Sequence, residues 1–189
     1  MESIHLTDRA VIAAQIGRAP RGLLGVPVRC SYGYPQVLRV RPVLGEEPFP
    51  TVYWLSCPHL VRAIDRLEAE GWIPRLERRM AGDARLRAAM NEAHGRYVRE
   101  RWATLAAEER ARLEALGRSL GLHERGIGGI ADRRWLKCLH LHVAHELADG
   151  NPIGRIVRGM IPSLECPPDG VRCTALGGGA SDGIEAGDR

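Results

Sequence analysis

The chain has 189 residues, of which 44% are hydrophobic and 26% charged, with a net charge of +4. This length suffices for one domain with a sizeable core, and no apolar run approaches the roughly 18 residues that a membrane span requires. The N-terminus has no basic region followed by an apolar one, so we expect no secretory signal and a cytoplasmic protein.

In a reducing compartment, the five cysteines are more often metal ligands, nucleophiles or buried apolar side chains than disulfides. The pI near 9.0 is compatible with anionic partners. Aromatic residues make up only 5% of the chain and no RNA-binding motif is present. We therefore expect a small anionic ligand, with nucleic acid as the less supported alternative.

The first predicted element is a short helix over Thr7–Ile16, which Gly17 ends. In the loop GRAPRG that follows, Arg18 and Arg21 flank a proline. Two guanidiniums on a glycine-bounded loop are suited to bind a carboxylate or phosphate. The alternative is two solvated arginines, because such pairs are common on protein surfaces.

Three strands are predicted next, over Val26–Cys30, Gln36–Arg41 and Thr51–Leu55. We expect the first two to pair as a hairpin and the second to be half-exposed, because its polar and apolar residues alternate. Strands come early and helices late, which predicts an α+β fold. The expected architecture is a small antiparallel sheet, from about residue 26 to residue 55, covered by helices in a single domain spanning residues 1–160.

The third strand runs directly into Cys57 and Pro58, and Pro58 fits the first turn of a helix. Cys57 would then lie at the helix N-terminus, where backbone amides and the helix dipole favour a thiolate. Its alternative role is a small side chain packed at a corner. From Pro74 to Gly121 the chain is helical in character, with a break at Gly82-Asp83, and the glycine-rich stretch Gly126–Ile130 is expected to be a flexible loop.

The densest group of reactive side chains lies in Trp135–Gly154, WLKCLHLHVAHELADGNPIG. We predict a helix here that ends near Gly150, since leucine and valine recur on one stripe at about 100° per residue. One cysteine and two histidines would share a second face, at i, i+4 and i+7: Cys138, His142 and His145. Between the two faces lie Lys137 and His140, at i and i+3.

Lys137 is the only lysine among the 27 lysines and arginines of the chain. Where arginine is so strongly preferred, a retained lysine is a candidate for a position that needs a compact ammonium group. The alternative is a surface lysine retained by chance. We predict that Lys137 faces a pocket.

After a short predicted helix over Ile156–Met160 comes a tail, residues 161–174, which contains Cys166 and Cys173 and is able to pack on the domain. Residues 175–189 are rich in glycine and poor in apolar residues, so we expect disorder there.

The motifs RAPRG, RCSYGYP, PFPTVYWLSCPHL, RLEAEG, KCLH, AH and NPIG together resemble the bacterial family catalogued as domain of unknown function 501. The resemblance runs from about Arg18 to Gly154, and the family pattern more often has threonine where this chain has Ser56. It implies a compact bacterial cytosolic protein without an established activity. The motifs coincide with side chains that could carry chemistry: Cys30, Cys57, Lys137, Cys138, His140 and His145.

The first functional hypothesis is a metal centre with thiolate ligands, holding zinc or an iron–sulfur cluster. Its predicted ligands are Cys30, Cys57, Cys138 and Cys166, with Cys173 as the alternative to Cys166 and with His142 or His145 as a substitute for one thiol. We expect Cys30, Cys57 and Cys138 to converge, although no local C-x-x-C pair is present.

The second hypothesis is a metal-free cysteine enzyme acting on a small anionic substrate. Cys57 would be its nucleophile, His140 or His142 its base, and Lys137 a further catalytic candidate, while Arg18 or Arg21 would hold the anion. The third hypothesis is a non-enzymatic basic module that binds a protein or nucleic acid, with the cysteines as core residues.

Overall fold

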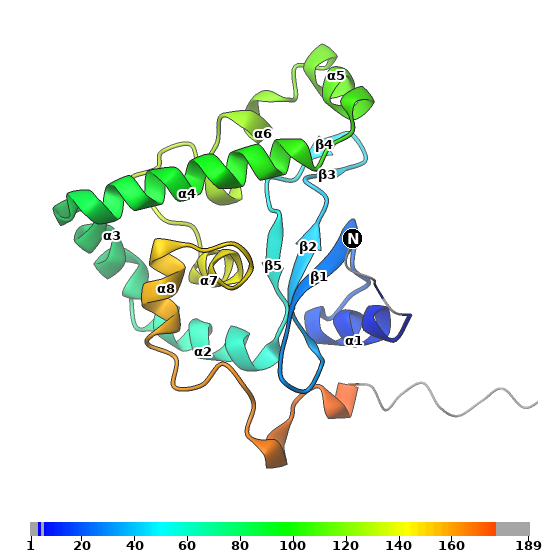
Figure 1. Cartoon of the computed structure of the whole chain (residues 1–189), viewed down its shortest axis with the longest axis vertical. Coiled ribbons are helices and arrows are strands. Elements are labelled where there is room, and N and C mark those ends of the chain that lie inside the picture. The colour runs from blue at the N-terminus through cyan, green and yellow to red at the C-terminus, as the bar shows by residue number, and fades with distance from the viewer. Residues whose placement is uncertain (1–3, 5, 177–189) are drawn as a thin grey trace, which may run out of the picture.

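A small antiparallel sheet separates one helix from the other helices in the computed structural model, which describes residue 4 and residues 6–176 (Figure 1). Its strands, in spatial order, are β1 (Leu23–Arg29), β2 (Pro35–Val40) and β5 (Tyr53–Leu55). Between β2 and β5 the chain forms a separate short hairpin of β3 (Val43–Leu44) and β4 (Glu47–Pro48). The predicted α+β class, with a small antiparallel sheet in a single domain, is confirmed.

The central strand β2 is buried on both faces, so the prediction of a half-exposed strand is wrong. Val37 and Leu38 are 0% and 1% exposed, although adjacent residues of a strand point to opposite faces. Val37 joins the large core on one face, and Leu38 packs with Ile12 of α1 (Leu6–Ile16) on the other. Both faces of the strand are therefore covered, the face of Leu38 and Val40 by α1 and the face of Val37 by the large core.

The remaining helices are α2 (Pro58–Ala69), α3 (Trp72–Gly82), α4 (Ala84–Ala103), α5 (Ala107–Ala115), α6 (Leu120–His123), α7 (Leu139–Ala148) and α8 (Pro152–Arg158). Most of them surround α7 on the other face of the sheet, whereas α5 lies beside the β3–β4 hairpin, away from α7 (Figure 1). Seven of the ten residues of α7 are buried, and this helix contacts β5, α2 and α8. α7 is therefore the centre of the fold, as its apolar stripe indicated.

The predicted break before α4 is confirmed at Asp83, whose carboxylate accepts hydrogen bonds from the amides of Arg85 (2.9 Å) and Leu86 (3.0 Å). A carboxylate in this position satisfies helix amides that have no partner within the helix.

Arg101 of α4 is fully buried and binds the loop that follows α6. Its guanidinium donates hydrogen bonds to four backbone carbonyl oxygens, those of Leu122 (2.7 Å), Gly126 (3.0 Å), Pro50 (3.1 Å) and Arg125. Burial lowers the pKa of Arg101 to about 10, so the group stays charged at neutral pH. The loop is thereby attached to both α4 and the end of the β3–β4 segment.

The start of α7 differs from the prediction, because the helix begins at Leu139 and not at Trp135. The amide of Leu136 donates to Glu77 Oε1 (2.9 Å), and the amide of Leu139 donates to Glu68 Oε1 (2.5 Å). These carboxylates come from α3 and α2, so tertiary contacts decide where the helix starts. Cys138 is the N-cap residue, with extended backbone, and does not continue the helical face of the two later histidines.

The connection from α7 to α8 places two backbones in close contact. Gly150 has a φ of +97°, and the Asn151 side chain caps α8 by accepting a hydrogen bond from the Gly154 amide (2.8 Å). Gly154 packs directly on the backbone of His142, in a space that a Cβ atom would fill. The sequence NPIG thus makes both a turn and a tight helix crossing.

The segment after α8 contains two single 3₁₀ turns, Pro168–Gly170 and Thr174–Leu176. The predicted disorder of residues 175–189 stays a prediction, since nearly all of it falls on residues 177–189, outside the described residues. Across the described ranges, no helix combines the length and apolar character needed to cross a membrane.

Candidate functional site

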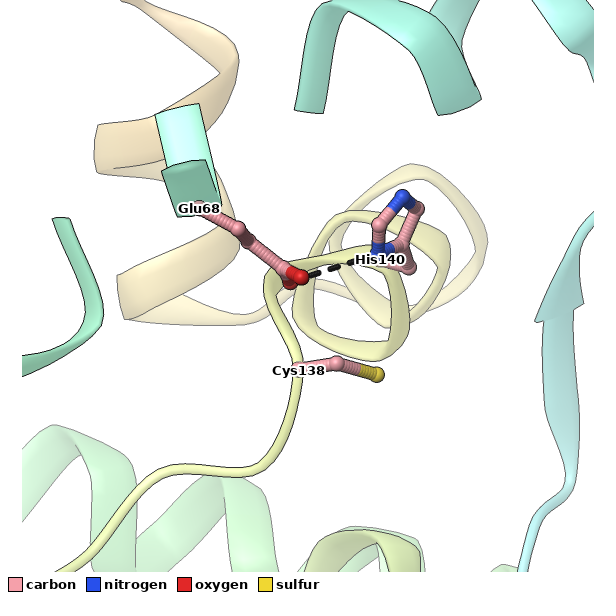
Figure 2. A group of neighbouring side chains, drawn as sticks. All are labelled: Glu68, Cys138 and His140. Carbon is pink, nitrogen blue, oxygen red and sulfur yellow. Dashed lines mark ion pairs between the residues drawn. The ribbon is translucent and has the colours of Figure 1, made fainter. Parts of the chain in front are cut away.

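Three potential metal ligands meet at the start of α7. Glu68, Cys138 and His140 each offer one ligand atom, and these atoms all lie within 4.8 Å of one another. Figure 2 shows Glu68 reaching from α2 to the point where Cys138 and His140 lie, on the first residues of α7 and the turn before it. We refer to these three residues as the Glu68–Cys138–His140 group.

The N-terminus of α7 determines how Glu68 and Cys138 are placed. Glu68 lies in the last turn of α2, and its Oε1 accepts the hydrogen bond from the Leu139 amide. Cys138 is the exposed N-cap residue of the same helix. Free amides and the positive end of the helix dipole stabilise both a carboxylate and a thiolate at this position.

His140 connects the group to two further acceptors. Its Nδ1 lies 3.2 Å from Glu68 Oε1 (Figure 2), while its Nε2 lies 3.2 Å from Asp65 Oδ1 and 3.3 Å from the carbonyl oxygen of Val61. Burial acts to lower the pKa of His140. Hydrogen bonds to Cys138 and Val61, with the negative charges of Glu68 and Cys138, outweigh burial and raise the pKa to about 9. Without a metal, the ring is therefore a cation at neutral pH.

A cavity of about 450 Å³ lies beside the group. Most of its wall is apolar or aromatic, and its polar end is formed by the consecutive segment Lys137–Cys138 together with His140. The prediction that Lys137 faces a pocket is confirmed. The lining residues are Phe49, Thr51, Tyr53, Trp54, Leu55, Val61, Gly128, Lys137, Cys138, His140 and Leu141.

Gly128 closes the cavity on the side of the Arg101-bound loop. It has a φ of +63°, and a Cβ atom there would collide with the side chain of Leu141 and lie 3.2 Å from Lys137 Cγ. Glycine is thus required by backbone conformation and by the space next to the lysine.

The two arginines predicted to bind an anion have different surroundings. The guanidinium of Arg18 lies over the ring of Trp54, 5.0 Å from its centroid, and Trp54 lines the cavity. Arg21 is exposed and does not line the cavity. Arg18 thus contacts a residue of the cavity wall without lining the cavity itself.

The other two predicted histidine ligands lie in the core and not in the Glu68–Cys138–His140 group. His142 and His145 are 1% and 0% exposed. Burial lowers the pKa of His142 to about 3 and that of His145 to about 4. His145 packs between Tyr53 and Tyr97, with ring centroids 5.8 Å and 4.9 Å away. Their neutral rings act as core side chains in this arrangement.

The remaining cysteines also lie outside the Glu68–Cys138–His140 group. Cys57 is at the N-terminus of α2, whereas Glu68 is near its C-terminus, about 16 Å away at 1.5 Å per residue. Burial raises the pKa of the Cys57 thiol to about 11, against the effect of the His59 and Leu60 amides, so the expected thiolate is not favoured. The structure thus separates Cys138 from Cys57, although both are helix N-cap residues.

The acidic members of the site were not predicted from the sequence. Glu68 and Asp65 occupy neighbouring turns of α2, in a stretch that reads as an ordinary charged helix surface. They reach His140 because α2 packs against α7. Glu68 does stand in the motif RLEAEG, but the motif gives no reason to place it at a site, since about 70 residues separate it from the cysteine and histidine it approaches.

The fold and the site together define an α+β domain with a group of three possible metal ligands beside a mostly apolar cavity. Residues 26–159 match the family described as "Protein of unknown function (DUF501)", and the chain belongs to this family. No curated protein and no solved structure matches the chain. The matched segment includes the whole Glu68–Cys138–His140 group and every residue that lines the cavity.

Proposed function

We propose that the chain binds one zinc ion through Glu68, Cys138 and His140 and uses it to hydrolyse a small anionic substrate. The observation that carries this proposal is the convergence of three ligand atoms within 4.8 Å at the polar end of a cavity. Oxygen, sulfur and nitrogen donors are the usual ligands of zinc. Catalytic zinc sites have three protein ligands and keep the fourth position open for water or substrate.

The surroundings of His140 fit this role. Its Nδ1 faces Glu68, so Nδ1 would bind the ion, and its Nε2–H would donate to Asp65 or to the Val61 carbonyl. A second-shell acceptor of this kind fixes the ring and increases its basicity. Because the pKa of His140 is about 9, its ring carries a proton at neutral pH that zinc would have to replace. The affinity of the protein for zinc should therefore rise with pH.

The cavity supports a substrate with an apolar body and one anionic group. Its aromatic and aliphatic wall would hold the body, and Lys137 would pair with the anion next to the zinc-bound water. Zinc lowers the pKa of bound water to about 7 and polarises a carbonyl or phosphoryl oxygen. Lys137 is a positioning residue in this proposal.

The test is a zinc titration of chelator-treated protein, followed by desalting and elemental analysis. We expect one zinc per chain for the unmodified protein, and strong loss for Cys138→Ala and His140→Gln. His123→Gln is the matched control, because His123 is an exposed histidine stacked on Trp102 and lies outside the site. Unchanged zinc binding in both site variants would contradict the proposal.

A metal-free reaction is the second candidate, and the closeness of Cys138 and His140, whose ligand atoms lie within 4.8 Å, favours it. A thiolate at Cys138 would attack the substrate, and His140, held by Glu68, would transfer the proton. Iodoacetamide modification separates the two candidates. A metal-free thiolate should react quickly at neutral pH and slowly in His140→Gln, whereas a zinc-bound thiolate should be protected until a chelator is added.

A further inference from the structure

A second collection of thiols lies in and beside the sheet, away from the Glu68–Cys138–His140 group. Cys30 directly follows β1, Cys57 precedes α2, and Cys166 and Cys173 belong to the segment after α8. Cys57 and Cys173 are buried, and Cys30 and Cys166 are half-buried. Four of the five cysteines, from three distant parts of the sequence, are therefore at least partly shielded from solvent.

Hydrogen bonds attach the segment containing Cys166 to the turn that follows Cys30. The amide and the hydroxyl of Ser31 both donate to Glu165 Oε2, each at 3.1 Å. The hydroxyl of Tyr32 donates to the carbonyl oxygen of Cys166 at 3.2 Å. These bonds join the two residues that follow Cys30 to Cys166 and to the residue before it.

The same segment is attached to the residues around Cys57. The Gln36 side chain donates to the Leu164 carbonyl oxygen (2.9 Å), and the Gln36 carbonyl oxygen accepts from the Cys57 amide (3.3 Å). The His59 ring lies 3.0 Å from the carbonyl oxygen of Ser163. Gln36 thus connects the backbone of Cys57 to a residue two positions before Cys166.

Cys173, the fourth of these cysteines, contacts α1. Its Sγ accepts a hydrogen bond from the Gln15 side chain (3.2 Å), which also donates to the Pro35 carbonyl oxygen (2.9 Å). The hydroxyl of Ser56, the residue before Cys57, donates to the same Pro35 carbonyl oxygen (3.4 Å). The Pro35 carbonyl oxygen thus links the side chain that contacts Cys173 to the residue next to Cys57.

We infer that Cys30, Cys57, Cys166 and Cys173 together ligate an iron–sulfur cluster. Four thiolates are the usual ligands of such a cluster. A single zinc ion fits less well, because tetrahedral Zn–S bonds of about 2.3 Å hold the sulfurs only about 3.8 Å apart. No three of these sulfurs lie within 4.8 Å of one another, among the residues that the structure describes. A cluster with its own bridging sulfides joins thiolates across a wider space.

The position of Cys57 also suits an anionic cluster. It is the N-cap residue of α2, a helix of 12 residues, so the free backbone amides of the first helical turn lie next to it. Helix N-termini and backbone amides stabilise the negative charge of a cluster and its thiolates. This site is independent of the proposed zinc ion, since it shares no ligand with it.

The test is anaerobic reconstitution of the full chain with ferrous iron, sulfide and dithiothreitol. After desalting, iron and acid-labile sulfide are measured, and the visible absorption of thiolate-to-iron charge transfer is recorded. We expect about four iron and four sulfide per chain if the cluster is the cubane form. Cys30→Ser and Cys166→Ser should each remove most of the iron and the absorption. Cys138→Ser is the matched control and should retain both.

Cys30 and Cys166 decide the test because they are half-buried, so their serine variants are the less disruptive ones. A thermal melt of each apo variant verifies that it is folded, and Cys166→Ala replaces Cys166→Ser if the serine variant is not. Iron retained by folded variants at both positions would overturn the inference. It would also fall if the unmodified chain took up no cluster, or bound one zinc at these thiols in its place. Loss of iron with retained zinc binding at Cys138 would separate this site from the proposed function.

Discussion

The Oε1 atom of Glu68 lies 3.2 Å from Nδ1 of His140 and accepts a hydrogen bond from the amide of Leu139. One carboxylate oxygen thus both caps α7 and pairs with the imidazole. Removing the charge of Glu68 should therefore affect the helix and the histidine together. Substitutions at Asp65, on the other side of the ring, should affect the histidine alone.

The stability of the metal-free protein should depend on His140. Its pKa is about 9 in the folded state and near 6.5 when unfolded, so the folded state binds the proton more tightly. The stabilisation is complete below pH 6.5 and is lost as pH rises through 9, amounting to about 1–3 kcal/mol. Urea unfolding between pH 6 and pH 10, with chelator present, measures it. Glu68→Gln should reduce this dependence and lower the pKa of His140 observed by NMR, and an unchanged pKa would disprove the pairing.

Acid should destabilise the fold through its buried histidines. Burial lowers the pKa of His94, His142 and His145 to about 4, 3 and 4, so all three fold as neutral rings. Their contribution to the free energy of unfolding is present above pH 6.5. It is lost as pH falls toward 4, at about 1.4 kcal/mol per pH unit for each ring that the unfolded state protonates.

The matched variant for this prediction is His142→Leu. Neither ring nitrogen of His142 has a hydrogen-bond partner in the described part of the chain, so leucine leaves no partner unsatisfied. Urea unfolding at pH 7 and pH 5 should show a pH dependence smaller by about one proton. The same pH dependence in His142→Leu would show that this ring does not titrate on unfolding.

Lys137→Arg should damage ligand binding more than stability. The arginine fork is larger and planar, and Gly128 leaves little room beside the lysine stem. Benzoate is a suitable probe, because it combines an apolar ring with one carboxylate. We expect its affinity, measured by NMR titration, to fall several-fold in Lys137→Arg and in Lys137→Met, with unfolding free energies within about 0.5 kcal/mol of the original. Benzyl alcohol, which lacks the charge, should bind all three proteins alike, and equal benzoate affinities would remove Lys137 from the site.

Gly154→Ala should be strongly destabilising. The added Cβ would press against the backbone of His142 and lie 2.6 Å from Glu146 Cβ, so α7 and α8 must move apart. We expect a loss of more than about 2 kcal/mol in urea unfolding. Gly159→Ala is the control, because its nearest atom would be the Ile156 carbonyl oxygen at an ordinary 3.4 Å. Equal stabilities of the two variants would contradict the close crossing.

The fold was predictable where local chemistry decides the structure. The three strands of the sheet, the Asp83 cap and the buried stripe of α7 all follow from residue type and spacing. The burial of Leu38 and the start of α7 at Leu139 were not predictable in this way. Each depends on a contact with a distant element, α1 in one case and α2 in the other.

The site divides in the same manner. Lys137, Cys138 and His140 stand together in the sequence, and the structure keeps them together at one end of the cavity. Their acidic partner Glu68 depends on the packing of α2 against α7, which no local periodicity encodes. For the same reason the sequence could not separate Cys57 from Cys138, because this depends on which end of α2 each one lies near.

The buried guanidinium of Arg101 has a consequence for how the cavity meets a ligand. Its side chain donates four hydrogen bonds, to the carbonyl oxygens of residues 50, 122, 125 and 126, and the last two hold the start of the glycine-rich loop that was expected to be flexible. Local unfolding of the loop would have to break the bonds at residues 125 and 126 and expose a buried cation to partial solvation. The Gly128 wall is therefore preorganised, and a ligand entering the cavity loses little affinity to the entropy of ordering this loop.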